Sequence, residues 1–284
     1  MEKCTAFVLG GGGSHGALQV GALRAFIEAG ITPDLFVGTS IGAVNATGMA
    51  VWGYNPAGLR ALEEGWGKVS DAQVLDERIS QLVIRAYLGR PSDRARKRAE
   101  EFFISLGLTR ELKFGMVDSV RLAMVSADIE TGQPIIYGQD PEELILESLL
   151  TSIAIPPWFP PFSREGHILM DGGVLSNVPI EPALRLGATE IYAFDLNDCV
   201  QKRSTNLSLT QYLQKYFQAI SSRTVELETA CAELKGVPVH RLNFPGLAAT
   251  SIHDFSQRQE MIQAGYTRAR QQLEEWQKGT TAKN

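Results

Sequence analysis

The first 52 residues alternate strand and helix patterns, with a glycine-rich turn at each strand-to-helix junction. Apolar runs at residues 5–9 and 34–37 predict short buried strands, and residues 16–29 and 41–52 carry apolar side chains at helical spacing. Further strand signals lie at residues 121–127, 134–137, 167–170, 191–194 and 237–242. A strand, a crossover helix and a second strand in this order build a parallel sheet with helices packed against it. We therefore expect an α/β fold.

Nothing in the sequence marks a boundary between two domains. The 284 residues are enough for one large α/β domain, and they contain neither an internal repeat nor a convincing linker. Residues 56–115 lack strand signals and predict several helices, which we interpret as a helical insertion. We expect a single domain over residues 1–284, with the functional motifs within residues 5–200.

Charge and cysteine content exclude several classes of protein. A net charge of −5 without a basic, aromatic-rich stripe argues against binding to nucleic acid. The cysteines, Cys4, Cys199 and Cys231, are too far apart for a metal or redox motif, and an odd, sparse set fits a reducing compartment. The first apolar run is too short for a signal peptide, and no run reaches the roughly 18 apolar residues of a membrane span. We expect a soluble, cytoplasmic protein whose contact with membranes is at most peripheral.

The motif Gly38-x-Ser40-x-Gly42 lies between the second strand and the following helix. A tight turn at this point holds a serine hydroxyl clear of its neighbours, and the flanking glycines remove Cβ atoms that would clash there. The positive end of the helix also favours negative charge developing at the serine. The alternative is a simple turn in which Ser40 caps the helix. We interpret Ser40 as a nucleophile.

A second glycine-rich loop follows the first strand and contains Gly11, Gly12, Gly13 and Gly16. Consecutive glycines let backbone N–H groups approach a bound oxygen, which suits an oxyanion hole. The same spacing also satisfies the G-x-G-x-x-G fingerprint of dinucleotide-binding proteins. That fingerprint needs an acidic residue at the end of the next strand, whereas Asp34 begins that strand. The sequence favours the oxyanion hole and keeps dinucleotide binding as the alternative.

The third motif, Asp171-Gly172-Gly173, follows the short strand predicted at residues 167–170. Taken alone, an Asp-Gly-Gly sequence is typical of a β-turn in which the aspartate binds its own backbone. Here it accompanies two other glycine-rich sites, each at the end of a strand, where open α/β sheets bind their ligands. We therefore interpret Asp171 as a residue that faces the serine.

Together these motifs resemble the patatin-like phospholipase family. The family's glycine-rich loop, nucleophile turn and distant D-G-G motif correspond to residues 11–16, 38–42 and 171–173, in the family's order and close to its spacing. Residues 152–156 (SIAIP) and 177–180 (NVPI) also look like family elements. The resemblance implies a three-layer α/β/α fold with a mainly parallel central sheet. It also implies acyl-ester lipid substrates and neither a metal nor an organic cofactor.

Most serine hydrolases use a histidine as base, so the four histidines are alternatives to an aspartate. The order Ser40, an aspartate and then His240 or His253 would fit an α/β-hydrolase, but that fold places several strands before its serine. Here a single strand precedes the nucleophile strand. We expect His15 at the start of a helix and His167 at the start of a strand. His15 also departs from the resemblance, because the family often has arginine there.

The resemblance implies a catalytic dyad of Ser40 and Asp171. Ser40 would be the nucleophile, Asp171 the base and then the acid, and the N–H groups of Gly11, Gly12 and Gly13 the oxyanion donors. An aspartate with an ordinary pKa near ~4 is a weak base toward a serine, and partial burial would raise that pKa. Partial burial of Asp171 would therefore help this mechanism.

The expected activity is hydrolysis of lipid carboxylic esters, of the phospholipase A or lysophospholipase type, through an acyl-Ser40 intermediate. The substrate would be a phospholipid or another acyl-ester lipid. Thioesterase or acyltransferase activity would use the same chemistry, and a dinucleotide-binding protein or a non-catalytic lipid-binding protein are alternatives of other classes. The proline-rich loop at residues 153–162 is interpreted either as the border of an acyl groove or membrane contact, or as a buried crossing loop.

Overall fold

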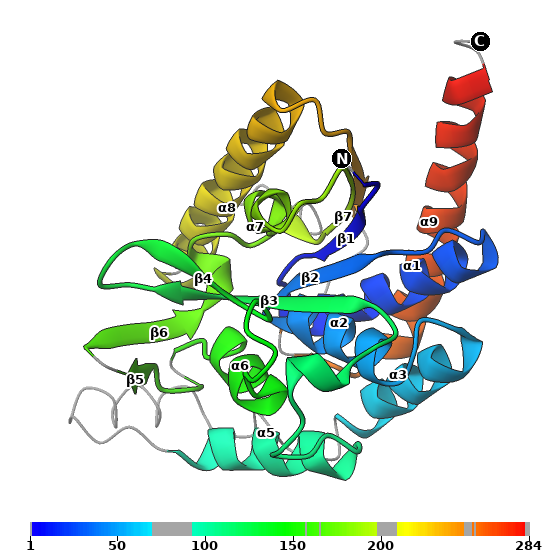
Figure 1. Ribbon diagram of the computed structural model, residues 1–284. Helices are drawn as coiled ribbons and strands as arrows, with labels where there is room; N and C mark the ends of the chain where they lie inside the picture. The colour runs from blue at the N-terminus through cyan, green and yellow to red at the C-terminus, as the bar shows by residue number, and fades with distance from the viewer. Residues whose placement is uncertain are drawn as a thin grey trace.

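The computed structural model describes residues 2–69, 93–156, 158–164, 166–197, 209–246, 252 and 254–281. Within these residues the strands form one eight-stranded mixed sheet with helices on both faces (Figure 1). The strands are β1 (Thr5–Leu9), β2 (Leu35–Thr39), β3 (Arg121–Asp128), β4 (Gln133–Tyr137), β5 (Phe162–Arg164), β6 (His167–Asp171), β7 (Glu190–Asp195) and β8 (Val239–Asn243). The α-helices are α1 (Gly16–Glu28), α2 (Ile41–Val51), α3 (Pro56–Lys68), α5 (Arg94–Ser105), α6 (Ile145–Ser152), α7 (Ile180–Arg185), α8 (Leu209–Leu234) and α9 (Arg258–Thr281). The short 3-10 helices are η1 (Gly13–His15), η2 (Phe114–Met116) and η3 (Gly172–Val174).

The strand order is β5-β6-β3-β2-β1-β7-β8, and β4 pairs with β3 outside this path. The five strands from β3 to β8 in this order run parallel. The pairs that add β4, β6 and β5 are antiparallel. The mainly parallel α/β sheet predicted from the sequence is therefore confirmed. Because the parallel strands all end at one edge, the turns after β1 and β2 meet there.

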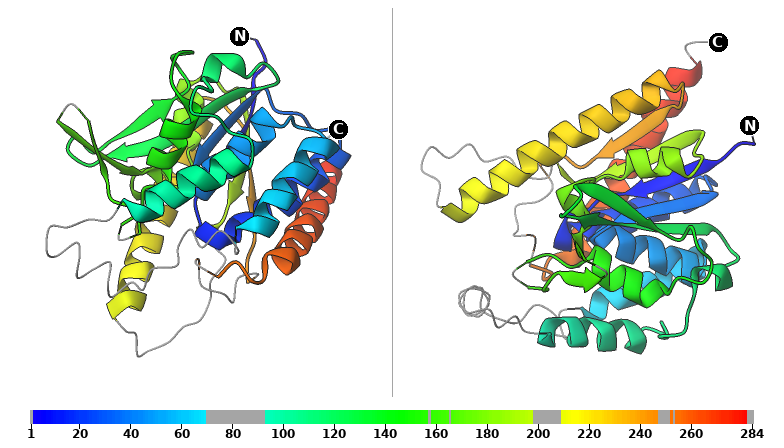
Figure 2. Two further views of the ribbon diagram at one scale, coloured as in Figure 1. Left: turned by 90° about the horizontal axis from the view of Figure 1, so that it is seen from below. Right: turned by 60° about the vertical axis from the view of Figure 1, so that its left-hand side comes forward.

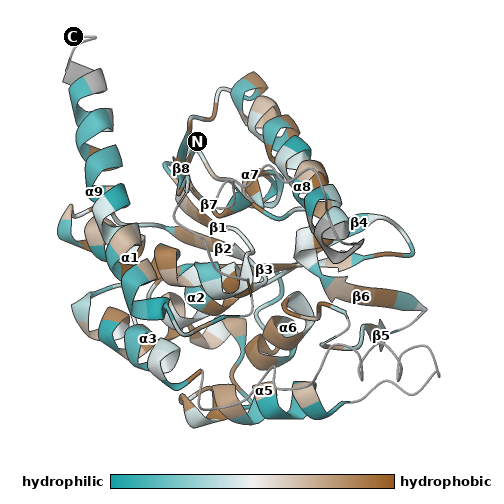
Figure 3. Cartoon of the chain, turned by 180° about the vertical axis from the view of Figure 1, so that it is seen from behind, coloured by the Kyte–Doolittle hydropathy of each residue, from teal (hydrophilic) through white to brown (hydrophobic). Residues whose placement is uncertain are grey.

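Alternate side chains of the central strands supply two apolar cores, one on each face of the sheet. Phe7 and Leu9 of β1 belong to a core that includes residues of α1, α2, α3, α5, α6 and α9. Ala6 and Val8 of the same strand belong to a second core with residues of α7 and α8. In Figure 3 the central strands are largely brown, whereas much of the outward surface of α9 is teal. The sheet thus separates two helical layers, as a three-layer α/β/α fold requires.

Several element boundaries differ from those predicted. Helix α6 was not predicted from the sequence, and the loop predicted at residues 153–162 contributes its last residue to β5. The predicted helical insertion at residues 56–115 contains α3 and α5, and residues 70–92 lie outside the described part. No helix among the described residues is both long and apolar enough to cross a membrane.

Candidate active site

Ser40 forms the turn between β2 and α2. Its backbone angles, φ 55° and ψ −127°, make it the only non-glycine residue with positive φ in the described part of the chain. Such a conformation costs on the order of 1–3 kcal/mol and persists where the surrounding structure imposes it. Gly42 lets α2 start close against β1, because a Cβ there would lie 2.0 Å from the carbonyl oxygen of Leu9. The motif therefore lies at a strained strand-to-helix turn, the conformation that exposes a nucleophilic serine.

A second serine, Ser152 at the end of α6, supports this turn through its hydroxyl group. The backbone N–H of Ser40 donates to Ser152 Oγ over 3.2 Å, and Ser152 Oγ donates to the carbonyl oxygen of Val125 over 2.7 Å. Ser152 is completely buried. A single hydroxyl thus connects α6, β3 and the nucleophile turn. The sequence marked Ser152 only through its resemblance to a family element and gave it no role.

Asp171 ends β6, where it pairs with Ser126 of the neighbouring strand β3. Its backbone N–H donates to the carbonyl oxygen of Ala154 over 2.9 Å, and its Oδ1 accepts a 2.8 Å hydrogen bond from the N–H of Gly173. The residue is only 2% exposed. The backbone therefore fixes both the position and the orientation of the carboxyl group.

Burial raises the pKa of Asp171 from 3.8 to about 6, against the lowering effect of hydrogen bonds from the Ser40 side chain and the N–H of Gly173. The other carboxyl oxygen, Oδ2, is buried and makes no hydrogen bond of ordinary geometry within the described residues. The serine hydroxyl is thus close enough to influence the carboxyl without a tight hydrogen bond. Loose contacts of this kind are common between catalytic groups that tighten in the substrate complex.

The glycine loop lies against the serine turn, but its three predicted donors are not equivalent. A Cβ on Gly11 would lie 3.1 Å from the Cβ of Ser40. The N–H of Gly11, however, donates to the carbonyl oxygen of Asn177 over 3.0 Å, so the prediction that it binds the oxyanion is corrected. Within the described residues, no carbonyl accepts the N–H of Gly12 or Gly13. Of the other glycines in the three motifs, Gly16 begins α1, Gly38 lies in β2, and Gly172 and Gly173 lie in η3.

A chain of buried polar side chains supports the glycine loop. The amide of Gln19 donates to the carbonyl oxygen of Gly10 over 2.8 Å, and the amide of Asn45 donates to Gln19 over 2.9 Å. The indole N–H of Trp66 donates to Asn45 over 2.9 Å. Gln19 and Asn45 are completely buried. None of these three side chains was predicted from the sequence, where the available signal was polar residues within the apolar helical patterns.

The described histidines lie in three different elements, η1, β6 and β8. His15 is buried at the end of η1, His167 contacts Asp128 at 2.7 Å, and His240 lies on β8. His253 lies outside the described residues. Among the described residues, the groups that shift the pKa of Asp171 are Ser40 and Gly173.

The structure gives no support to dinucleotide binding by the loop at residues 11–16. The Asp34 carboxylate accepts a 2.8 Å hydrogen bond from the N–H of Thr5, at the start of β1. It therefore lies at the edge of the sheet opposite the glycine loop, where it cannot reach a ribose bound there. The described residues contain no group of histidine, cysteine and carboxylate side chains arranged to hold a metal ion.

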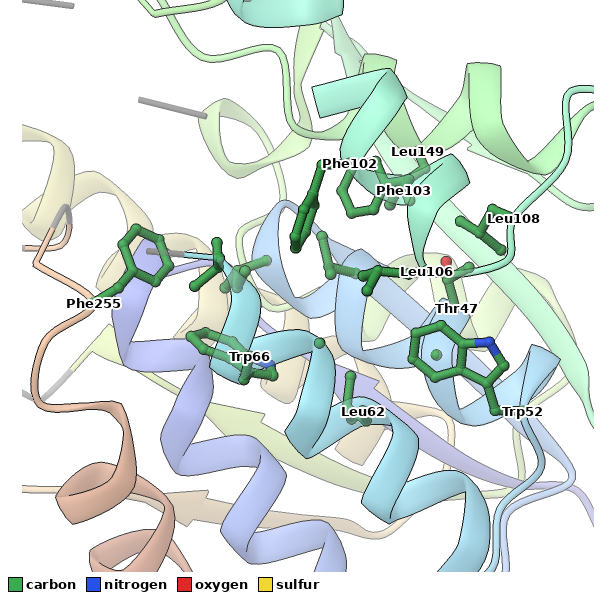
Figure 4. Close-up of a pocket in the computed structure, with 15 residues that line it drawn as sticks. Thr47, Trp52, Leu62, Trp66, Phe102, Phe103, Leu106, Leu108, Leu149 and Phe255 are labelled. Carbon is green, nitrogen blue, oxygen red and sulfur yellow. The ribbon is translucent and has the colours of Figure 1, made fainter. Parts of the chain in front are cut away.

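An apolar pocket begins at Ile41, directly after the candidate nucleophile (Figure 4). It encloses about 510 Å³ of empty space, including its open mouth, between helices α2, α3, α5 and α6. Its lining is Ile41, Val44, Thr47, Gly48, Trp52, Leu62, Gly65, Trp66, Val69, Phe102, Phe103, Leu106, Leu108, Leu149 and Phe255. The loop at residues 153–162, which the sequence suggested as a groove border, contributes none of these residues.

The fold is of the three-layer α/β/α class with a strained serine turn at a strand end, and comparison with known proteins defines the family. The family model described as Patatin-like phospholipase matches residues 7–184, which is more than half of the chain. The chain belongs to the patatin-like phospholipase family. The resemblance inferred from the three motifs is therefore confirmed.

Individual relatives are distant, and some are much longer. Patatin-like phospholipase domain-containing protein 7 of Mus musculus is 26% identical over 206 residues, which are 71% of this chain but 14% of that protein. Among solved structures, human GIVD cytosolic phospholipase A2 in complex with a fluorophosphonate inhibitor has a TM-score of 0.52 at 13% identity, covering 99% of this chain and 59% of the other. VipD from Legionella pneumophila has a TM-score of 0.51 at 16% identity, covering 96% and 67%. These two structures share the fold.

Proposed function

We propose that this chain is a serine acyl hydrolase that cleaves lipid carboxylic esters, of the phospholipase A or lysophospholipase type. The observation that carries the proposal is the strained Ser40 turn beside a buried Asp171 whose pKa is raised to about 6. A base with a pKa closer to neutrality removes a serine proton more effectively and is still ionised at neutral pH. The names of the family and of its relatives, which include phospholipases, agree with this chemistry.

The reaction would proceed in two halves. Asp171 accepts the Ser40 proton as the serine oxygen attacks the ester carbonyl, and the protonated Asp171 then gives that proton to the departing alcohol. This leaves an acyl-Ser40 intermediate. In the second half Asp171 takes a proton from water, the hydroxide attacks the acyl carbon, and the proton returns to Ser40 as the fatty acid leaves.

The negative charge on the carbonyl oxygen needs hydrogen-bond donors in both halves. We assign this role to the N–H groups of Gly12 and Gly13, because no described carbonyl occupies them and their loop lies against the serine turn. Each donor of an oxyanion hole is worth roughly 3 kcal/mol of the barrier. The hydrogen bond from Gly11 to Asn177 would then hold the loop in place.

The apolar pocket supports a long acyl chain as the acid part of the substrate. It begins at Ile41, next to Ser40, and extends along α2 as far as Trp52. This length of helix is about 17 Å, close to that of an extended chain of roughly a dozen methylene groups. Its lining is almost entirely apolar, so an acyl chain would gain free energy by leaving water.

A fluorophosphonate probe with a long alkyl chain tests the nucleophile directly. An activated serine oxygen displaces fluoride from phosphorus, so the folded protein should gain one probe on Ser40, detected by intact-protein and peptide mass spectrometry. The same protein unfolded in urea should remain unlabelled, because activation depends on the assembled site. An unmodified folded protein, or an adduct on another residue, would contradict the proposal.

A narrowed pocket should change acyl-chain preference without removing catalysis. Val44 lines the pocket about one turn of α2 after Ile41, and Val44→Phe places a ring in the path of the acyl chain. We expect kcat/KM for a dodecanoyl ester to fall at least about ten-fold relative to a butanoyl ester, since each methylene in an apolar pocket is worth roughly 1–3 kcal/mol. Val51→Phe is the matched control, because Val51 is half-buried on the same helix but outside the pocket lining. An unchanged ratio in Val44→Phe would remove the pocket from the acyl site.

A further inference from the structure

The first turns of α8 extend from the body of the protein and carry large apolar side chains in water. In the second half of the helix, Ser221, Val225, Glu228 and Ala232 are buried at the spacing of one helix face. The first half has no such face among its described side chains. Its exposed large side chains are Tyr212 (57%), Tyr216 (62%), Phe217 (56%) and Ile220 (39%). Large apolar groups gathered in one exposed place are typical of a binding surface.

This projecting segment lies at the edge of the sheet that carries the active site. In the right-hand view of Figure 2, the yellow N-terminal end of α8 extends past the edge where β1 and its parallel neighbours end. The helix is fixed to that edge at the base of the projection. Gln218 donates to the backbone carbonyl of Asn197 over 2.8 Å, and Ser221 donates to the Asn197 side chain over 2.8 Å. Asn197 in turn accepts a 3.0 Å hydrogen bond from Asn177 beside the glycine loop.

The charge of the segment suits a lipid surface. Residues 209–222 contain no Asp or Glu and a single Lys, Lys215, in a chain whose net charge is −5. Lys215 is exposed and lies between Tyr212 and Tyr216 in the sequence, where an anionic headgroup can reach it. Tyrosine has an apolar body and a polar tip, which suits the boundary between water and acyl chains. The alternative occupant of this segment is a second copy of this chain. That copy would approach the edge of the sheet through which a lipid must reach Ser40.

We propose that Tyr212, Tyr216, Phe217 and Ile220, here called the α8 apolar segment, dock the protein onto an anionic lipid surface with its active-site edge toward the lipid. The inference rests on the proposed function, since a lipid substrate must reach that edge from a membrane or micelle. Docking through an exposed helix requires no rearrangement of the core. It raises the local concentration of substrate and leaves the chemistry at Ser40 unchanged.

The test separates lipid binding from catalysis. Binding of the full chain is measured by flotation with vesicles of dialkyl-ether phosphatidylcholine and phosphatidylglycerol, which contain no carboxylic ester to hydrolyse. Removing both aromatic groups with the double substitution Tyr216→Ser and Phe217→Ser should weaken vesicle binding by at least about ten-fold, because apolar area buried in the interface drives such binding. Leu234→Ser, at the opposite end of the same helix and 89% exposed, should bind like the wild type.

Two further measurements identify the partner. Lys215→Glu should weaken binding to anionic vesicles and leave binding to purely zwitterionic vesicles nearly unchanged. Turnover of a water-soluble butanoyl ester should be the same in the wild type and the double variant, whereas turnover of ester phospholipid in vesicles should fall. The proposal would be overturned if the wild type did not bind the ether vesicles or if the double variant bound them as strongly as the wild type. It would also be overturned if Leu234→Ser lost as much binding as the double variant. A dimer in light scattering that the double variant converts to monomer would assign the segment to a second copy instead.

Discussion

Ser40→Ala is expected to reduce ester hydrolysis on the order of 10⁵-fold, to the background rate. In the proposed mechanism the hydroxyl oxygen forms the acyl intermediate, and removing a nucleophile of this kind eliminates the covalent pathway altogether. Alanine adds no new backbone strain relative to serine at φ 55°, because both residues carry a Cβ. The variant should therefore fold, and circular dichroism should match that of the wild type.

The measurement is the steady-state rate with p-nitrophenyl esters of medium and long acyl chains. Ser105→Ala is a suitable control, since Ser105 is an exposed serine at the end of α5 whose hydroxyl donates to the local carbonyl of Phe102. Near wild-type turnover by a folded Ser40→Ala protein would exclude the acyl-serine mechanism. The same assay with added lysophospholipid tests acyltransferase activity, because an acyl-serine can be attacked by an alcohol as well as by water.

The features that were best predicted from the sequence are those that depend on a pattern of neighbouring residues. Each strand-to-helix turn combines a buried apolar run, glycines and a helical period within a few tens of residues, and the structure has β1, η1 and α1, and then β2, Ser40 and α2, in those places. Glycine was informative because Gly42 lies where the α2 backbone touches β1, and a residue with a side chain does not fit there. Asp171 could be singled out because its motif accompanies two other glycine-rich sites at strand ends, and the structure has it at the end of β6.

The missed features depend on contacts between distant parts of the chain. Ser152 is 112 residues from Ser40, and nothing near it in the sequence indicates that its hydroxyl supports the nucleophile turn. The hydrogen bond between Gly11 and Asn177 also joins segments far apart, so three adjacent glycines could not be told apart as donors. The apolar pocket was missed for the same reason, because most of its lining comes from four separate helices whose apolar side chains look like ordinary core.

The raised pKa of Asp171 changes how the base can be identified. An aspartate of ordinary pKa would keep its activity well below the pH at which an imidazole becomes protonated. A value of about 6 places the acidic limb of the kcat/KM profile close to that of a histidine. The value of kcat/KM should therefore fall below about pH 6 whether Asp171 or a histidine is the base. Substitutions must distinguish these two mechanisms.

Asp171→Asn is expected to lower kcat/KM by roughly 10²–10⁴-fold and to abolish the limb near pH 6, because asparagine cannot accept the serine proton. The amide keeps the size of the carboxyl, and its oxygen can still accept from the N–H of Gly173. His240→Ala should retain near wild-type turnover, since His240 lies on β8 and the described contacts do not join it to Asp171. The same holds for His253→Ala if the dyad lacks a histidine. An inactive but folded His253→Ala protein, with turnover as low as that of Asp171→Asn, would replace the dyad with a triad.

Asp171→Asn should also stabilise the fold. This effect distinguishes a buried carboxyl that acts as a base from a carboxylate whose role is only structural. Because the folded-state pKa of about 6 lies above the unfolded value near 4, the folded protein binds the Asp171 proton more tightly than the unfolded chain. Ionisation of the buried carboxyl therefore weakens the fold as the pH rises from about 4 to about 6, by on the order of 3 kcal/mol once complete. Asparagine does not ionise, so Asp171→Asn should melt at a higher temperature than the wild type at pH 8, and the difference should disappear near pH 4. A structural carboxylate stabilised by ionisation would give the opposite order at pH 8, with the asparagine variant less stable and the loss of activity explained by unfolding.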